Sequence, residues 1–208
     1  MRGNRWDLEA FLTSGRGEAE VLRRRLAESF PDVPRGRALD FGCGVGRVTR
    51  ALAGHFESVV GADIAPSMIR KARELSAGVG GVEYVLSESD DLGFVASGSI
   101  DLVYSNIVLQ HVGQPYVGRY LAEFVRVLSP KGLAVFQMPY ARTLRARLGE
   151  AYKSLRYGSL RMQMHVLPEE EVRAIVERTG GQVVRCDESG AAGVRYPSKL
   201  YFVRRDKS

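Results

Sequence analysis

The sequence has little cysteine and no long apolar run, and each of these absences excludes a class of protein. Its two cysteines, Cys43 and Cys186, are too few for a disulfide framework and lack the spacing of a zinc site. No apolar stretch approaches the roughly 20 residues that span a bilayer, and the polar first residues lack the apolar segment of a secretory signal. These absences predict a protein of the reducing cytoplasm that holds no metal ion.

A strong charge imbalance is also absent. Lys and Arg number 30 against 24 Asp and Glu, a formal charge of +6, which permits an anionic partner such as nucleic acid without indicating one. Hydrophobic residues make up 45% of the chain and charged residues 26%, the proportions of a globular enzyme with a buried core. The length of 208 residues favours a single domain, present as a monomer or a homodimer.

Short β-branched runs alternate with longer helical patterns along the chain, which is typical of a parallel α/β sheet. A helix is expected over residues 18–30, within a helical N-terminal segment of residues 1–34. The seven expected strands are residues 37–41, 58–62, 82–86, 100–105, 133–138, 182–186 and 199–203. The other expected helices are residues 48–55, 66–77, 115–128 and one that begins at Pro168.

Residues 140–166 interrupt the alternation after the fifth expected strand. Leu144, Leu148, Tyr152 and Leu155 recur at helical spacing, which predicts an inserted helix rather than a bare loop. Six basic residues and a single acid lie in this insertion. It is either a solvated helix face or a lid that screens an anionic acceptor, such as a carboxylate or phosphate compound. Its interleaved tyrosines leave an RNA-binding surface open as well.

A glycine-rich turn, Asp40-Phe41-Gly42-Cys43-Gly44-Val45-Gly46, follows the first expected strand and precedes a helix. Such a turn lies at the carboxyl edge of an open α/β sheet, where ligands bind, and its glycines let a ligand approach the backbone. Asp40 would repel a pyrophosphate but suits the ammonium group of an amino acid. Asp63, which ends the second strand, can accept both hydroxyls of a ribose. Arg47 follows the last glycine, so the third glycine of the dinucleotide motif is missing and NAD-type oxidoreduction is disfavoured.

The ordered motifs resemble those of the class I S-adenosylmethionine-dependent methyltransferases, in particular the small-molecule enzymes with a D-x-G-x-G-x-G turn. The resemblance covers roughly residues 37–139. Beyond the turn it rests on Gly61-Ala62-Asp63-Ile64-Ala65-Pro66-Ser67-Met68, Leu86-Ser87-Glu88-Ser89-Asp90-Asp91-Leu92, Ser99-Ile100-Asp101-Leu102-Val103-Tyr104-Ser105-Asn106, Leu109-Gln110-His111-Val112 and Arg126-Val127-Leu128-Ser129-Pro130-Lys131-Gly132. It implies a single methyltransferase domain over residues 1–208, with a Rossmann-like, seven-stranded, mostly parallel sheet, helices on both faces and a helical lid at residues 140–166.

The resemblance also implies S-adenosylmethionine as the cofactor and S-adenosylhomocysteine as the product. Asp63 would hold the ribose hydroxyls and Ile64 would pack on the adenine. Glu88 stands where the family often has Asp near the adenine amino group, so its longer side chain is a departure from the pattern. The residues expected at the cofactor are Arg16, Asp40, Gly42, Gly44, Asp63, Ile64, Met68, Glu88, Ser89, Asn106 and Ile107.

Methyl transfer from a sulfonium is an in-line displacement, so alignment of the two reactants supplies much of the acceleration. A general base helps only when the nucleophile must lose a proton. The candidates near the expected methyl site are Gln110, His111, Tyr140 and His165, each of which has an alternative interpretation as a packing or capping residue.

The expected reaction is methyl transfer to an oxygen or nitrogen of a small molecule, with carbon also permitted. Two alternatives remain at this point: an RNA methyltransferase, and a non-catalytic partner subunit that binds the cofactor without turnover.

Overall fold

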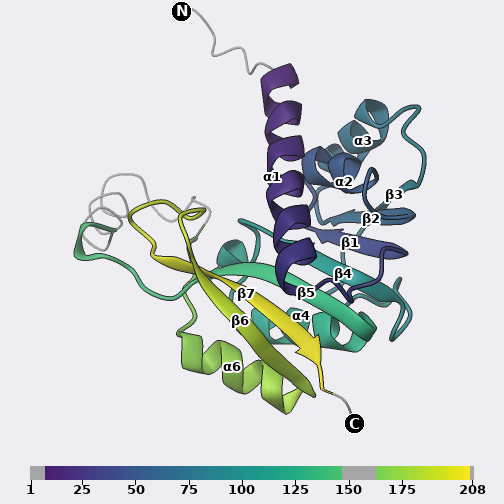
Figure 1. Ribbon diagram of the computed structural model, residues 1–208. Coiled ribbons are helices and arrows are strands. Elements are labelled where there is room, and N and C mark those ends of the chain that lie inside the picture. Colours follow the sequence, from purple (N-terminus) through teal and green to yellow (C-terminus); the bar gives the residue numbers. More distant parts are fainter. Residues whose placement is uncertain (1–7, 147–162, 207–208) are drawn as a thin grey trace, which may run out of the picture.

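The computed structural model describes residues 8–146 and 163–206 (Figure 1). Its seven strands form one sheet in the order β3-β2-β1-β4-β5-β7-β6. The strands are β1 (Arg37–Phe41), β2 (Ser58–Asp63), β3 (Val82–Leu86), β4 (Ile100–Ser105), β5 (Leu128–Pro139), β6 (Gly181–Ser189) and β7 (Ser198–Arg205). Only β7 runs antiparallel to its neighbours, β5 and β6. The predicted seven-stranded, mostly parallel sheet is therefore confirmed.

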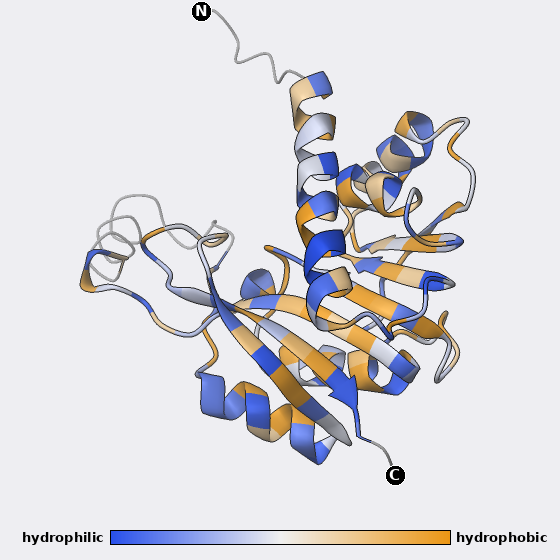
Figure 2. Cartoon of the chain, viewed as in Figure 1, coloured by the Kyte–Doolittle hydropathy of each residue, from blue (hydrophilic) through white to orange (hydrophobic). Residues whose placement is uncertain are grey.

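Helices cover both faces of this sheet, as the sequence predicts. They are α1 (Leu8–Ser29), α2 (Arg47–Leu52), α3 (Pro66–Leu75), α4 (Tyr116–Val127) and α6 (Glu169–Arg178), with a short 3-10 turn, η1 (Leu109–His111). The apolar side chains of α1 and α2 form one core with β1, β2, β4, β5 and β7, and those of α4 and α6 form another on the opposite face. Figure 2 shows the apolar residues along the strands between these layers. No helix in the described ranges is long and apolar enough to cross a membrane.

Helix α1 begins ten residues earlier than the expected start at residue 18. The glycines in its first half do not end the helix, although each is a poor helix former. A Cβ on Gly15 would lie 2.3 Å from the carbonyl oxygen of Arg47, so only glycine allows α1 to pack this closely on the start of α2. The helix thus reaches the glycine-rich turn, which the shorter prediction missed.

Strand β5 also begins earlier than expected, at Leu128 instead of residue 133. The segment expected to be a loop pairs with β4 through an irregular register between Ile100 and Leu102. A Cβ on Gly132 would lie 2.6 Å from the carbonyl oxygen of Ile100, so a glycine is required where the two strands approach. Glycine inside a strand often marks such a bulge. The sequence pattern instead indicates a turn at this glycine.

The predicted helical insertion at residues 140–166 falls mainly on residues 147–162, which lie outside the described residues. Of the described parts, Thr143 contacts the loop between β6 and β7, where its N–H donates to the carbonyl of Arg195 at 3.1 Å, whereas residues 163–166 lie at the carboxyl edge of the sheet. The N–H of Leu167 donates to the carbonyl of Pro139, and the N–H of His165 donates to the carbonyl of Gln110 at 2.7 Å. The chain therefore returns from the insertion directly over η1.

Candidate functional site

The turn between β1 and α2 has left-handed backbone at three glycines, with φ of 76° at Gly42, 55° at Gly44 and 78° at Gly46. A Cβ on Gly42 would lie 2.3 Å from the side chain of Val108, and one on Gly46 would lie 2.1 Å from the hydroxyl of Tyr84. A Cβ on Gly44 would meet no atom within 4 Å. Gly42 and Gly46 are therefore enclosed by neighbouring side chains, whereas Gly44 exposes its backbone at the edge of the sheet.

The carboxylate of Asp63 is fixed beside this turn by two backbone donors. The N–H of Gly44 donates to Oδ2 at 2.8 Å, and the N–H of Ala65 donates to Oδ1 at 2.9 Å. An ionised carboxylate offers about four acceptor positions, so each oxygen retains capacity for a further donor. The bond to Gly44 also ties the end of β2 to the turn after β1.

Large apolar side chains stay exposed next to Asp63. Ile64 is 69% exposed and Met68, in the first turn of α3, is 42% exposed. Beyond β3, Glu88 and Ser89 are exposed as well, and the hydroxyl of Tyr120 donates to the carbonyl of Ser89 at 3.0 Å. The edge of the sheet from β1 to β3 thus combines an oriented carboxylate with an accessible apolar surface.

Asp40 lies beneath the turn and is only 5% exposed. Burial raises the pKa of its carboxyl group to about 6, although the hydroxyl of Thr49 donates to it at 2.6 Å and partly offsets this effect. The bond joins the last turn of β1 to α2. Asp40 therefore supports the glycine-rich turn from below, and its contact with a ligand amine stays a prediction.

The chain after β4 forms the other side of the site. Asn106 donates from Nδ2 to Glu18 at 2.8 Å, while its buried Oδ1 has no partner among the described residues. Ile107 adopts a φ of 64°, a conformation that is uncommon for a β-branched residue and is found where surrounding structure enforces it. Its N–H donates to Oε1 of Gln137 at 3.2 Å. Strain and an unpaired acceptor thus meet at this point.

Glu18 is a site residue that the sequence analysis missed. From α1 it accepts hydrogen bonds from the hydroxyl of Tyr104 at 2.6 Å and from Asn106, and it forms an ion pair with Arg47 at 2.7 Å. Burial raises the pKa of Glu18, but the bonds from Tyr104 and Asn106 and the charge of Arg47 outweigh burial and leave it below its usual value. The only sequence signal was its place on the expected helix, where an exposed glutamate is the common case.

Buried polar atoms without a hydrogen-bond partner gather at the ends of β4 and β5. In the described part of the chain they include Ser105 Oγ, Asn106 Oδ1, Gln110 Oε1 and Gln137 Nε2. Buried polar groups in folded proteins are nearly always paired, so such a group of exceptions calls for an explanation such as a ligand. This edge of the sheet has the polar atoms that a bound molecule would need.

Three of the four predicted catalytic candidates lie together. Nε2 of Gln110 and Nε2 of His111 are 3.2 Å apart, Nδ1 of His111 is 3.4 Å from the carbonyl oxygen of Gln163, and the ring of His165 lies over Gly113. These contacts place the histidines where the chain returns from the insertion. The structure thereby brings residues about 55 positions apart to the end of β4.

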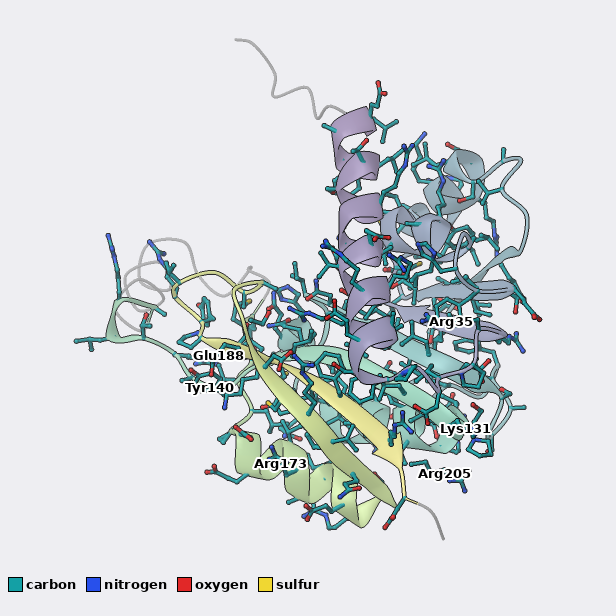
Figure 3. The ribbon with its side chains drawn as sticks, in the orientation of Figure 1. Arg35, Lys131, Tyr140, Arg173, Glu188 and Arg205 are labelled. Atoms are coloured by element: carbon teal, nitrogen blue, oxygen red, sulfur yellow. The ribbon has the colours of Figure 1, made fainter. Side chains whose placement is uncertain are left out.

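Tyr140, the fourth candidate, instead faces β7. Its ring contacts Nζ of Lys199 at 5.3 Å to the centroid, and Lys199 also lies 3.8 Å from Glu188. Tyr140 and Glu188 are labelled in Figure 3. Arg16, which was expected at the cofactor, is exposed on α1 and lines a shallow hollow with Arg47 and other residues of α1 and α2. No group of three or more potential metal ligands occurs in the described ranges.

Residues 39–136 match the family described as "Methyltransferase domain". This region contains the glycine-rich turn, Asp63 and the end of β4, and so includes most of the predicted cofactor residues. Glu18 and His165 lie outside it.

Curated relatives include two proteins named trans-aconitate 2-methyltransferase. The one from Deinococcus radiodurans is 35% identical over 118 residues, which are 56% of this chain and 43% of the relative. The one from Streptomyces avermitilis is 31% identical over 139 residues, 64% of this chain and 51% of the relative. The chain thus aligns with about half the length of these relatives.

Solved methyltransferases share the fold across nearly the whole chain. Magnesium protoporphyrin IX methyltransferase from Synechocystis PCC 6803, solved with bound SAH, superposes with a TM-score of 0.70 at 19% identity, covering 99% of this chain and 90% of that one. An S-adenosylmethionine-dependent methyltransferase from Clostridium acetobutylicum gives a TM-score of 0.71 at 11% identity, covering 91% of both chains. At these identities the likeness concerns the fold.

Proposed function

We propose that the chain is a class I S-adenosylmethionine-dependent methyltransferase, and that it transfers a methyl group from S-adenosylmethionine to an oxygen atom of a small molecule. The observation that carries the proposal is the open backbone at Gly44 beside the backbone-fixed carboxylate of Asp63. Two further relatives, named for ubiquinone biosynthesis and for malonyl-[acyl-carrier protein], are O-methyltransferases, and one named for phosphoethanolamine is an N-methyltransferase. With the two named for trans-aconitate, these names favour oxygen over nitrogen, and a small molecule over RNA, as the acceptor.

The residues between β1 and β3 fit the nucleoside part of this cofactor. Asp63 would accept the ribose hydroxyls with the lone pairs that Gly44 and Ala65 leave unused. Ile64 and Met68 would cover the adenine, which explains why two large apolar side chains stay exposed. Glu88 and Ser89 would contact the far edge of the base.

The residues after β1 and β4 fit the amino-acid part. The Oδ1 of Asn106, which has no partner in the described ranges, is a suitable acceptor for an ammonium group, and the exposed side chain of Ile107 would pack on the aliphatic portion. Asp40 would contribute negative charge from below the turn. Gly42 and Gly44 would provide close backbone contact.

When bound, S-adenosylmethionine supplies an electrophilic methyl group on a sulfonium. The acceptor oxygen would form a bond to the methyl carbon with one of its lone pairs, and the electron pair of the broken carbon–sulfur bond would remain on sulfur. A carboxylate acceptor is already ionised near pH 7, so it requires no general base. For such an acceptor Gln110, His111 and His165 would have no proton to remove.

Cofactor binding by calorimetry tests this proposal. The wild-type chain should bind S-adenosylhomocysteine, and Asp63→Ala should weaken this binding at least tenfold, because the ribose hydroxyls lose their acceptor. Asp187→Ala, which removes a half-buried carboxylate that pairs with Arg185 on β6, should bind like the wild type. Equal affinity in the Asp63 variant would contradict the ribose assignment. Transfer of radiolabelled methyl to RNA, with none to small acids, would contradict the acceptor class.

A further inference from the structure

A cavity of about 290 Å³ lies between α1 and the ends of β4 and β7. Figure 1 shows α1 passing over this side of the sheet, with the hairpin of β6 and β7 beside its second half. Polar residues from α1 and from the strands line the cavity, and its apolar lining residues are Val21, Leu22 and Leu200. The polar lining residues are Glu18, Arg25, Tyr104, Asn106 and Ser189. The volume is near the lower end of what small-molecule sites enclose.

Arg25 has a partly buried side chain and makes no hydrogen bond or ion pair with any residue that the structure describes. Its two neighbours on α1 differ, because Arg23 and Arg24 both pair with Glu20. An arginine in a cavity wall without a counter-charge is suited to binding an anion, and its planar fork matches a carboxylate.

Glu18 lies near the opposite end of the cavity, two helical turns from Arg25, or roughly 10 Å along the axis at 1.5 Å per residue. Its carboxylate is already held by Tyr104, Asn106 and Arg47, and it stays ionised because its pKa lies below the usual value. These are the two charged residues in the described lining of the cavity. An anionic group is therefore attracted to the Arg25 end and repelled from the Glu18 end.

We propose that this cavity binds the methyl acceptor and that Arg25 holds a carboxylate that is not the methylated group. This inference rests on the proposed function. Asn106 lines the cavity and also follows β4 at the expected methionine end of the cofactor, so a molecule in the cavity lies beside the methyl donor. The acceptor is then an acid with at least two polar ends separated by a short apolar portion, which packs on Leu22 and Leu200.

Binding of small acids to the complex with S-adenosylhomocysteine tests the assignment. The probes are trans-aconitate and a panel of dicarboxylic acids with three to eight carbons, measured by calorimetry with saturating S-adenosylhomocysteine. At least one acid should bind the wild type, and Arg25→Gln should weaken it at least tenfold. Arg25→Lys should give an intermediate affinity, because it keeps the charge but loses the fork. Arg24→Gln, the matched control on the same helix, should change affinity less than twofold.

Affinity for S-adenosylhomocysteine itself should be the same in all three variants, which separates this test from that of the proposed function. Failure of every acid to bind the wild-type complex, or equal binding by Arg25→Gln, would overturn the assignment of the cavity. Failure of the wild type to bind S-adenosylhomocysteine would instead overturn the proposed function.

Discussion

The two halves of the site at the carboxyl edge are built in different ways. Between β1 and β3, backbone groups form the site, since the N–H groups of Gly44 and Ala65 orient the carboxylate of Asp63 and the glycines shape the turn. Beyond β4, side chains from distant segments form the site: Asn106 donates a hydrogen bond to Glu18, which lies 88 positions earlier in the sequence. We refer to the glycine-rich turn with Asp40, Asp63 and Ile64 as the backbone half, and to Glu18, Asn106, Ile107 and Gln137 as the side-chain half.

The two halves also differ in which groups are free to contact a ligand. In the backbone half, the carboxylates of Asp40 and Asp63 are paired, and the open features are the exposed backbone of Gly44, the apolar Ile64 and the hydroxyl of Ser87, which is buried without a partner among the described residues. In the side-chain half, Asn106 and Gln137 each have a buried atom that no described residue pairs with, and Ile107 has a strained backbone. The first half is suited to a ligand of fixed shape, and the second to groups that complete its hydrogen bonds.

The largest expected effect comes from closing the backbone half with Gly44→Ala. Its φ of 55° makes any L side chain strained, at a cost of roughly 1–2 kcal/mol in stability. The new methyl group also projects into the space at the ligand edge, since no protein atom lies within 4 Å of it. We expect the affinity for S-adenosylhomocysteine to fall about a hundredfold, or roughly 2.7 kcal/mol, measured by calorimetry.

Gly78→Ala is the matched control for this change. Gly78 follows α3, has a φ of 85°, and its Cβ would likewise meet no atom within 4 Å. Both variants should lose similar stability in urea unfolding, but only Gly44→Ala should lose cofactor affinity. A parallel loss of affinity in both variants would mean that strain, and not the open backbone, governs binding.

The same difference explains what the sequence could predict. The turn, Asp63 and their place at the edge of the sheet follow from short local patterns, because backbone geometry at a glycine depends on its immediate neighbours. The fold also followed from local periodicity. The contacts of Glu18 did not, because they depend on α1 starting early and packing on α2 through Gly15. A glycine in a helix reads as a break unless the close approach of a second segment is known.

The next largest expected effect concerns Asp40, beneath the glycine-rich turn, and is a change in the free energy of unfolding that depends on pH. In the folded chain the pKa of Asp40 is about 6, above its ordinary 3.8, so the folded state binds more protons than the unfolded state between these values. Stability from this group is therefore present at low pH and is lost as pH rises through about 6. Asp40→Asn removes the loss and keeps an acceptor for Thr49.

We expect Asp40→Asn to gain stability relative to the wild type by roughly 2 kcal/mol between pH 4 and pH 7, since one pKa unit corresponds to about 1.4 kcal/mol. Urea unfolding of both proteins across this range measures the difference. A stability difference that does not change with pH would show that Asp40 is not held in a high-pKa environment. The carboxyl group of Asp40 would then have its usual pKa.

The smallest expected effect tests the side-chain half through Glu18→Gln. Glutamine keeps the size of the side chain but loses the ion pair with Arg47 and weakens the bonds from Tyr104 and Asn106, so stability should fall by about 1.5 kcal/mol in urea unfolding. Methyl transfer should fall more than affinity for S-adenosylhomocysteine, because the acceptor side loses its order. Glu20→Gln, two residues along α1 and paired only at the surface, should change stability by less than about 0.5 kcal/mol. Equal effects of the two changes would mean that α1 merely covers the sheet and that the side-chain half does not depend on it.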